Sequence, residues 1–183
     1  MKLIEGAREI IRDEGCAAVT AGRLARKVDL GRHIVHYYFG TIDQLLAEVI
    51  RFEGEILREH FTKALQNDQP LRALWDPSAT AVAPQTFELI ALAFRSEVIR
   101  AAVQQYTRLF RNMITAAVEA YLVSRGLSSN VSPVAIGLVV VSISQALAGD
   151  SAIGIQDGHA EVEQLVESWI RGFEQSGKWP GYD

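Results

Sequence analysis

The chain has 183 residues, of which 49% are hydrophobic and 22% charged, values that fit a soluble globular protein of one or two small domains. Its formal net charge of −4 by itself argues against a nucleic-acid-binding protein, and its single cysteine, Cys16, excludes a disulfide framework and a multi-cysteine metal site. The N-terminal residues lack the pattern of a signal peptide, and the longest apolar run, Val134 to Val141, is too short to span a bilayer. We therefore expect a cytoplasmic protein without membrane contact.

The N-terminal part of the chain is predicted to form three short helices. Apolar residues at helical spacing predict the first helix over Lys2 to Glu14. The second helix should begin after Thr20, whose hydroxyl can accept a hydrogen bond from a backbone N–H of the first turn. Asp29 to Gly31 then turns the chain into the third helix, Arg32 to Phe39, with Gly31 either at positive φ or acting as a weak N-cap.

The third predicted helix has a polar and aromatic outer face. We expect Val35, Tyr38 and Phe39 to face the first helix. The side chains left to face outward are Arg32, His33, Ile34, His36 and Tyr37. A short helix that exposes a cation, hydrogen-bond donors and aromatic rings suits a DNA major groove. The local charge agrees with this interpretation, because the basic residues between positions 20 and 39 stand against Asp29 alone; they are Arg23, Arg26, Lys27 and Arg32.

The rest of the chain is predicted to be helical, so the fold class is all-α. A long helix should begin at Thr41, which forms a capping box with Gln44, and continue to about Gln66. The remaining predicted helices cover Leu71–Trp75, Thr86–Phe94, Val98–Ser124, Val134–Ala148 and Ala160–Gln175. Asp76–Pro84 is expected to be a loop or a mobile lid, and Gly149–Gly158 a glycine-rich break. The last six residues, from Lys178, are expected to pack lightly if at all.

Residues Leu3 to Phe52 resemble the DNA-binding domain of the TetR family of bacterial one-component regulators. Thr20 stands where the family caps its second helix, and Leu24-Ala25 matches an Ile/Leu-Ala pair within that helix. The segment His36 to Phe39 matches three of the four residues in the aromatic cluster that ends the family's recognition helix. A small-residue step and an acidic, Leu-rich helix follow at Gly40 to Leu46, as they do in the family.

Four positions depart from the family pattern. The family usually has Gly at the position of Asp29, Ser or Thr at that of Gly31, a phosphate-binding Tyr at that of His36 and a phosphate-binding Lys at that of Ile42. His36 can still donate a hydrogen bond, whereas the contact at Ile42 is lost, and Asp29 adds a negative charge to the turn. These departures keep open an alternative function, that of a helical small-molecule-binding protein with weakened or lost DNA binding.

The resemblance implies a helix-turn-helix DNA-binding head at residues 1–50 and an effector-binding and dimerisation domain at residues 51–183. It implies a homodimeric, ligand-responsive repressor that binds a palindromic operator in double-stranded DNA. Thr20, Arg32, His36 and Tyr37 are expected to hold phosphates, and His33 and Ile34 to touch base edges. The full set of expected DNA-binding residues is Thr20, Arg23, Lys27, Gly31, Arg32, His33, Ile34, His36, Tyr37 and Thr41.

The second domain is expected to bind a small, apolar effector that lowers operator affinity through the long helix after Thr41. The resemblance implies that some residues of this domain line the effector cavity, although a plain core role is favoured for each aromatic ring; the candidates are His60, Trp75, Phe87, Phe94, Tyr106 and Phe110. The last two predicted helices have wide apolar faces and are expected to form the dimer seam, with Val134, Leu138, Val141, Trp169 and Phe173 as candidates.

No enzyme motif is apparent. Ser151 lies among glycines, but Ile153 stands where the G-x-S-x-G motif requires Gly. His33 and His36 lie three positions apart on one helix and lack a third metal ligand nearby. The sequence also carries no phosphate-binding loop and no dinucleotide fingerprint. We therefore expect no enzyme activity, no cofactor and no metal.

Overall fold

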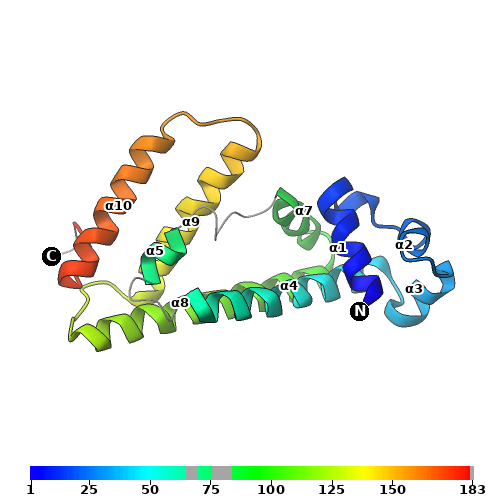
Figure 1. The fold of residues 1–183 in the computed structure, drawn as a ribbon, viewed down its shortest axis with the longest axis horizontal. Helices are drawn as coiled ribbons and strands as arrows, with labels where there is room; N and C mark the ends of the chain where they lie inside the picture. The colour runs from blue at the N-terminus through cyan, green and yellow to red at the C-terminus, as the bar shows by residue number, and fades with distance from the viewer. Residues whose placement is uncertain (65–69, 76–83, 182–183) are drawn as a thin grey trace. The chain divides into compact units, whose positions relative to one another are not determined.

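The computed structural model describes residues 1–64, 70–75 and 84–181, and every regular element within these ranges is a helix (Figure 1). The elements in chain order are α1 (Lys2–Glu14), the 3-10 helix η1 (Cys16–Ala18), α2 (Ala21–Lys27), α3 (Arg32–Phe39), α4 (Ile42–Ala64), α5 (Pro70–Trp75), α7 (Pro84–Ala93), α8 (Glu97–Arg125), α9 (Pro133–Ala152) and α10 (His159–Ser176). The all-α fold class is therefore confirmed, whereas η1 was not predicted. The predicted loop over Asp76–Pro84 lies outside the described residues except for Pro84.

The chain divides into two compact units. Unit 1 comprises Met1–Leu57 and Ala83–Leu109, and unit 2 comprises Arg58–Val82 and Phe110–Asp183. The helices α4 and α8 each contribute to both units, because each crosses a unit boundary. The predicted division at residue 50 separates a DNA-binding part from an effector-binding part, which is a division by function rather than by contacts. It stays a prediction.

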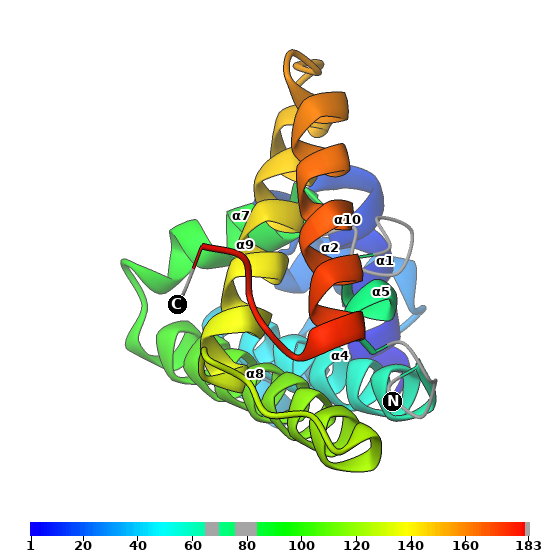
Figure 2. The ribbon, with the colours of Figure 1, turned by 90° about the vertical axis from the view of Figure 1, so that its left-hand side faces the viewer.

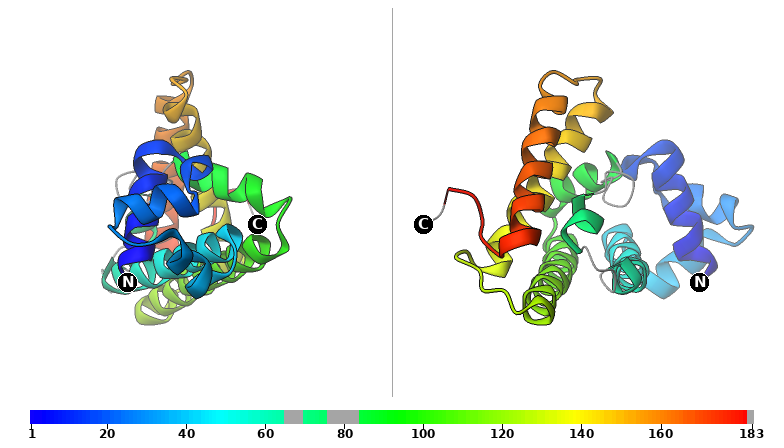
Figure 3. Two further views of the ribbon diagram at one scale, coloured as in Figure 1. Left: turned by 90° about the vertical axis from the view of Figure 1, so that its right-hand side faces the viewer. Right: turned by 60° about the vertical axis from the view of Figure 1, so that its left-hand side comes forward.

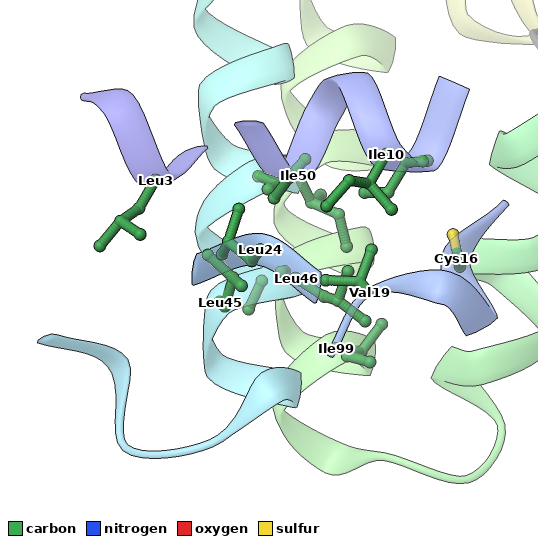
Figure 4. Close-up of a cluster of buried hydrophobic side chains, with 14 of the residues drawn as sticks. Leu3, Ile10, Cys16, Val19, Leu24, Leu45, Leu46, Ile50 and Ile99 are labelled. Carbon is green, nitrogen blue, oxygen red and sulfur yellow. The ribbon is translucent and has the colours of Figure 1, made fainter. Parts of the chain in front are cut away.

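Unit 1 is built around the buried faces of α1, α2, α3 and α4. Ile10 of α1, Leu24 of α2 and Leu45 of α4 have no exposed surface, and Ile99 of α8 joins them in one cluster (Figure 4). The three N-terminal helices pack together (Figures 1 and 3). Their close approach requires Gly6, because a Cβ atom at this position would lie 2.5 Å from Cγ1 of Val28. The core of unit 1 thus fixes α2 and α3 against α1.

Unit 2 is built around α9 and α10, which run side by side (Figures 1 and 2). Phe173 of α10 and Val140 of α9 have no exposed surface, and Val118 of α8 is buried as completely. A Cβ atom on Gly137 of α9 would lie 2.1 Å from Cγ2 of Ile114, so glycine is needed where α9 meets α8. The short helix α5 packs against α9 and buries Leu71 and Trp75.

Helix α9 is longer than predicted. It continues through the glycine at position 149 to Ala152, so the first part of the predicted glycine-rich break is helical. A glycine inside a helix costs only about 1 kcal/mol relative to alanine, which the surrounding apolar packing can offset. The break itself lies further along the chain, where Gly154 and Gly158 have φ values of 85° and 79°.

Helix α9 is also the most apolar long helix in the described part of the chain. Pro133–Ala152 is long and apolar enough to cross a membrane by length and composition, although the core helix of a soluble protein passes the same test. The apolar run from Val134 to Val141, on which the sequence prediction was based, is only part of this helix. Only 28% of the most apolar 18-residue stretch of α9 is buried within the chain, so other described residues leave much of the surface of this helix uncovered.

The C-terminal tail packs more tightly than predicted. Trp179 is 9% exposed and contacts the rings of Trp169 and Phe173, with centroids 5.8 and 6.1 Å away. Asn130 bonds both backbone groups of Trp179, accepting from its N–H at 2.8 Å and donating to its carbonyl oxygen at 3.2 Å. The expectation of a lightly packed tail was wrong up to this residue, because these partners are distant in the sequence.

Candidate DNA-binding surface

The turn between α2 and α3 is closed by backbone hydrogen bonds. Thr20 caps α2, since its Oγ1 accepts from the N–H of Arg23 at 3.1 Å. At the other end the N–H of Leu30 donates to the carbonyl oxygen of Ala25 at 2.9 Å, the 6→1 bond of a Schellman motif. The motif places Asp29 in the left-handed region, at φ 54°. Of the two alternatives expected for Gly31, the structure supports the second, because Gly31 has φ −70° and is the N-cap of α3.

Two side chains of α3 face opposite to the predicted direction. Ile34 is partly buried against the unit 1 core, and Tyr38 is 68% exposed. Val35 faces inward as predicted and is 1% exposed. Tyr38 follows Ile34 by about one helical turn, but α3 ends at Phe39. At this end of the helix, Phe39 and Ile42 pack against the core in place of Tyr38. The predicted contact of Ile34 with a base edge is therefore restricted by its packing.

The outer face of α3 exposes polar and aromatic groups. Tyr37 is 82% exposed, and its ring meets that of Tyr38 edge-on with centroids 5.2 Å apart. Arg32 and His33 are exposed as well. The imidazole of His33 lies over the backbone of Gly31, where a Cβ atom would stand 2.5 Å from Cε1 of the ring. A glycine at this position leaves room for the histidine ring, which the Ser or Thr usual in the resembled family would displace.

His36 is tied to the end of its own helix. Its Nδ1 lies 3.0 Å from the carbonyl oxygen of Gly40, and a carbonyl oxygen only accepts, so Nδ1 carries the hydrogen. In a neutral ring Nε2 is then an acceptor, and it can donate to a phosphate only when the ring is protonated. This geometry allows the phosphate contact expected of His36 in the imidazolium form.

Two of the predicted DNA-binding cations are paired with carboxylates of α1. The guanidinium of Arg23 donates to both oxygens of Glu14, from Nη2 at 2.5 Å and from Nε at 3.2 Å. The ammonium of Lys27 lies 2.8 Å from Oε2 of Glu9. The hydrogen bond from Arg23 lowers the pKa of Glu14, and the bond from Lys27 lowers the pKa of Glu9. No spacing rule predicts these pairs, because they join different helices.

The other predicted DNA-binding residues differ in whether their side chains already have partners within the chain. Arg32 and Arg26 are exposed and have no ion-pair partner among the residues that the structure describes. Thr41 forms the predicted capping box: its N–H donates to Oε1 of Gln44 at 3.0 Å, and its Oγ1 accepts from the N–H of Gln44 at 3.1 Å. The Thr41 hydroxyl also lies 3.3 Å from Oε1 of Gln44, so local bonds occupy it.

The predicted effector residues are divided between the two units. Trp75 is buried in unit 2 and Phe110 is partly buried there, whereas the other described candidates belong to unit 1. Tyr106 packs against the unit 1 core, and Phe87 and Phe94 are 44% and 79% exposed. Phe94 therefore lies on the surface of this chain rather than in a closed cavity. The side chain of His60 lies outside the described part of the chain.

Unit 2 contains an ion pair that the sequence analysis did not predict. Arg72 of α5 donates from Nε to Oε2 of Glu174 in α10 at 3.1 Å, and the carboxylate is only 12% exposed. Its other oxygen, Oε1, is buried and has no hydrogen-bond partner within the described ranges. The two residues are far apart in the chain, so no local pattern predicts the pair.

The predicted dimer residues separate into two groups. Val134 and Leu138 are 45% and 41% exposed, and Trp169 is partly buried. Val141 and Phe173 are 7% and 0% exposed, so they belong to the chain's own core and cannot form an interface as predicted. The error arose because α9 is apolar on all sides, so that periodicity does not identify its inner face. Two further apolar residues of these helices are exposed in the single chain; they are Val139 at 40% and Leu165 at 47%.

Comparisons with known proteins agree with the helical arrangement. Residues 3–49 match the family model described as bacterial regulatory proteins, tetR family. The chain is 28% identical over 188 residues to the HTH-type transcriptional regulator BetI of Rhizobium meliloti (strain 1021), covering 97% of this chain and 92% of that protein.

Two solved structures share the fold at low sequence identity. One is a TetR transcription regulator from Haloarcula marismortui, with a TM-score of 0.74 and 18% identity, covering 92% of this chain and 94% of that one. The other is a putative transcriptional regulator from Saccharomonospora viridis in complex with choline, with a TM-score of 0.75 and 13% identity, covering 93% of this chain and 94% of that one. Both similarities extend over nearly the whole chain.

Proposed function

Since the chain belongs to the TetR family of bacterial transcriptional regulators, we propose that it is a ligand-responsive repressor that binds a palindromic operator as a homodimer. The observation that carries this proposal is the outer face of α3. There Arg32, His33 and Tyr37 are exposed, while Val35 anchors the helix in the core. A helix held by its neighbours with a polar face free has the form needed to enter a major groove.

Individual contacts follow from the groups on this surface. Arg32 and Tyr37 bind phosphates, and His33 reads a base edge. Thr20 uses a lone pair to cap α2, so its O–H hydrogen can still donate to a phosphate. Protonated His36 donates from Nε2, because its Nδ1 is bound to Gly40. The exposed ring of Tyr38 adds an aromatic contact at the end of α3.

The homodimer is proposed to form through α9 and α10. Val134, Leu138, Val139 and Leu165 are apolar side chains of these helices that are at least 40% exposed in the single chain. Burying such surface against a second copy is favourable by about 25 cal/mol per Å² of apolar area. A two-fold axis through this seam would present two α3 helices to DNA, and the operator would then be a palindrome.

The effector is proposed to be a small molecule of apolar character that binds within unit 2. The shared fold of the Saccharomonospora regulator, whose structure holds choline, supports a small-molecule site in this architecture. The buried Oε1 atom of Glu174 has no partner among the described groups, and a donor or a cationic group of the effector would satisfy it. Effector binding would lower operator affinity through α4, which contributes to both units.

The decisive experiment is selection from random duplex DNA by the purified full-length protein, at low and at moderate salt. Enrichment of a palindrome with half-sites about one helical turn apart is the expected result. Salt-sensitive binding without any enriched sequence would overturn the proposal, since it would indicate non-specific phosphate contacts alone. The protein would then fit the second function considered, that of a helical small-molecule-binding protein that has lost sequence-specific DNA binding.

A further inference from the structure

The cations of α2 are not equally available to DNA. Arg23 is held by both oxygens of Glu14, and Lys27 is held by Glu9. Within residues 20–39 the described cations without an ion-pair partner are Arg26 and Arg32. Two of the four positive charges on this part of the head are thus neutralised by carboxylates of the adjacent helix α1.

These ion pairs are partly exposed to solvent, and this exposure limits their contribution to stability. The side chains of Arg23 and Glu14 are 39% and 37% exposed, and those of Lys27 and Glu9 are 25% and 50% exposed. Ion pairs in contact with water contribute little to stability, so folding does not depend on them. Their effect on DNA binding is larger, because sequence-independent affinity grows with every cation that neutralises a phosphate. A cation that already has a carboxylate partner adds little to that attraction.

We propose that Glu14 and Glu9 limit the sequence-independent affinity of the DNA-binding head. By pairing with Arg23 and Lys27 they weaken the attraction of the head for DNA of any sequence, so the contacts of α3 contribute a larger share of operator binding. This inference rests on the proposed DNA binding. It assigns a role to acidic residues of α1, which lie outside the helix-turn-helix motif.

The test is Glu14→Gln, with binding measured to random duplex DNA and to the selected operator over a range of salt concentrations. Releasing Arg23 should add about one phosphate contact, which steepens the salt dependence by about 0.9 in slope. That slope corresponds to about a further threefold loss of affinity between 50 and 200 mM salt. Binding to random DNA and binding to the operator should both tighten, because a phosphate contact is made on DNA of any sequence. Glu9→Gln should act in the same way through Lys27.

Two controls separate this effect from a general change of charge. Glu5→Gln removes the same charge from α1 at an exposed position without an ion-pair partner in the described residues. It should leave the salt slope unchanged. In an Arg23→Ala background, Glu14→Gln should no longer steepen the slope, because the released cation is absent. Equal effects of Glu5→Gln and Glu14→Gln, or a gain that persists without Arg23, would overturn the inference.

Failure of the inference can be told apart from failure of the proposed function. If the parent protein selects an operator but Glu14→Gln leaves the salt slope and the affinity for random DNA unchanged, only the role of Glu14 is wrong. If the parent selects no operator, the proposed function fails and this inference fails with it. A thermal unfolding curve for each variant verifies that the exposed substitutions leave the fold intact.

Discussion

The backbone N–H of Cys16 donates a 2.6 Å hydrogen bond to Oε2 of Glu88, which joins η1 to α7. Gly15 permits this approach, because a Cβ atom there would lie 3.1 Å from the same oxygen and its φ of 85° disfavours any other residue. A second bond runs from Nε2 of Gln85 to the carbonyl oxygen of Arg12 at 3.1 Å. The end of α1 is therefore held by side chains of a helix far away in the sequence.

The Cys16 thiol should be unreactive in the folded protein. Burial, together with the smaller effect of the nearby Glu88 carboxylate, raises the pKa of this thiol from its ordinary value of 9.0 to about 12. Since the thiolate is the reactive form, an aromatic disulfide reagent at pH 8 should label Cys16 only after urea unfolds the protein. Rapid labelling of the native protein would contradict the buried placement.

The same thiol should make stability depend on pH in the alkaline range. Between pH 9 and about 12 the unfolded chain loses a proton that the folded chain keeps, so the free energy of unfolding should fall as the pH rises. Below pH 9 both states hold the proton and no dependence is expected from this group. Cys16→Ala should flatten the slope above pH 9 in urea titrations, whereas an unchanged slope would assign it to other groups.

Asp29 should be a strained residue whose replacement stabilises the head. Its φ of 54° suits glycine better than aspartate, so Asp29→Gly should raise the free energy of unfolding by about 0.5–1 kcal/mol. Asp29→Asn should stabilise less, since Asn only tolerates this conformation. Both variants remove a negative charge from the turn and should tighten DNA binding alike. Urea unfolding and DNA titration measure the two effects, and destabilisation by glycine would show that the Asp29 side chain holds the turn.

Arg32 should contribute one phosphate contact to DNA binding. It is exposed on α3 without an ion-pair partner in the described part of the chain, so Arg32→Ala should weaken binding and reduce the salt slope by about 0.9. Arg111→Ala removes the same charge from an exposed position of α8 in unit 2 and serves as the matched control. A titration of operator DNA at several salt concentrations gives both slopes. Equal slopes for the two variants would contradict the placement of α3 on DNA.

Charge on the exposed face of α9 or α10 should break the proposed dimer. Leu138→Glu and Leu165→Glu put a carboxylate where a second copy would bury an apolar side chain, and burying an unpaired charge is costly. Light scattering coupled to size-exclusion chromatography should detect monomers for both. Val123→Glu changes a residue of α8 that is 80% exposed and should remain dimeric. Dimers of all three variants would exclude this seam.

The contact between Asn130 and the tail should stabilise unit 2. Asn130→Ala leaves both backbone groups of Trp179 without their partner, which should cost about 1–3 kcal/mol. Trp179→Ala should cost about 3 kcal/mol or more, because it empties a buried site beside Phe173. Urea unfolding gives both values. Asn112→Ala, at an exposed position of α8, is the control that should change stability little.

The sequence alone determined where the helices begin and end in most of the chain. Thr20 caps α2, and Thr41 and Gln44 form the predicted capping box at the start of α4. These signals act within a single turn, so they can be recognised without knowing the fold. The order of such signals also carried the family resemblance in the head, which is why the helix-turn-helix could be located from residues alone.

Only the tertiary structure decided which sides of the helices face inward and which charges meet. On the apolar helix α9, Val141 is buried and Leu138 is exposed. Tyr38 is exposed at the end of α3, where its side chain does not reach the core. The tertiary structure also brought Glu14 to Arg23 from the neighbouring helix. Each of these outcomes depends on which helix lies alongside, and that is set by packing between distant segments rather than by interactions within one turn.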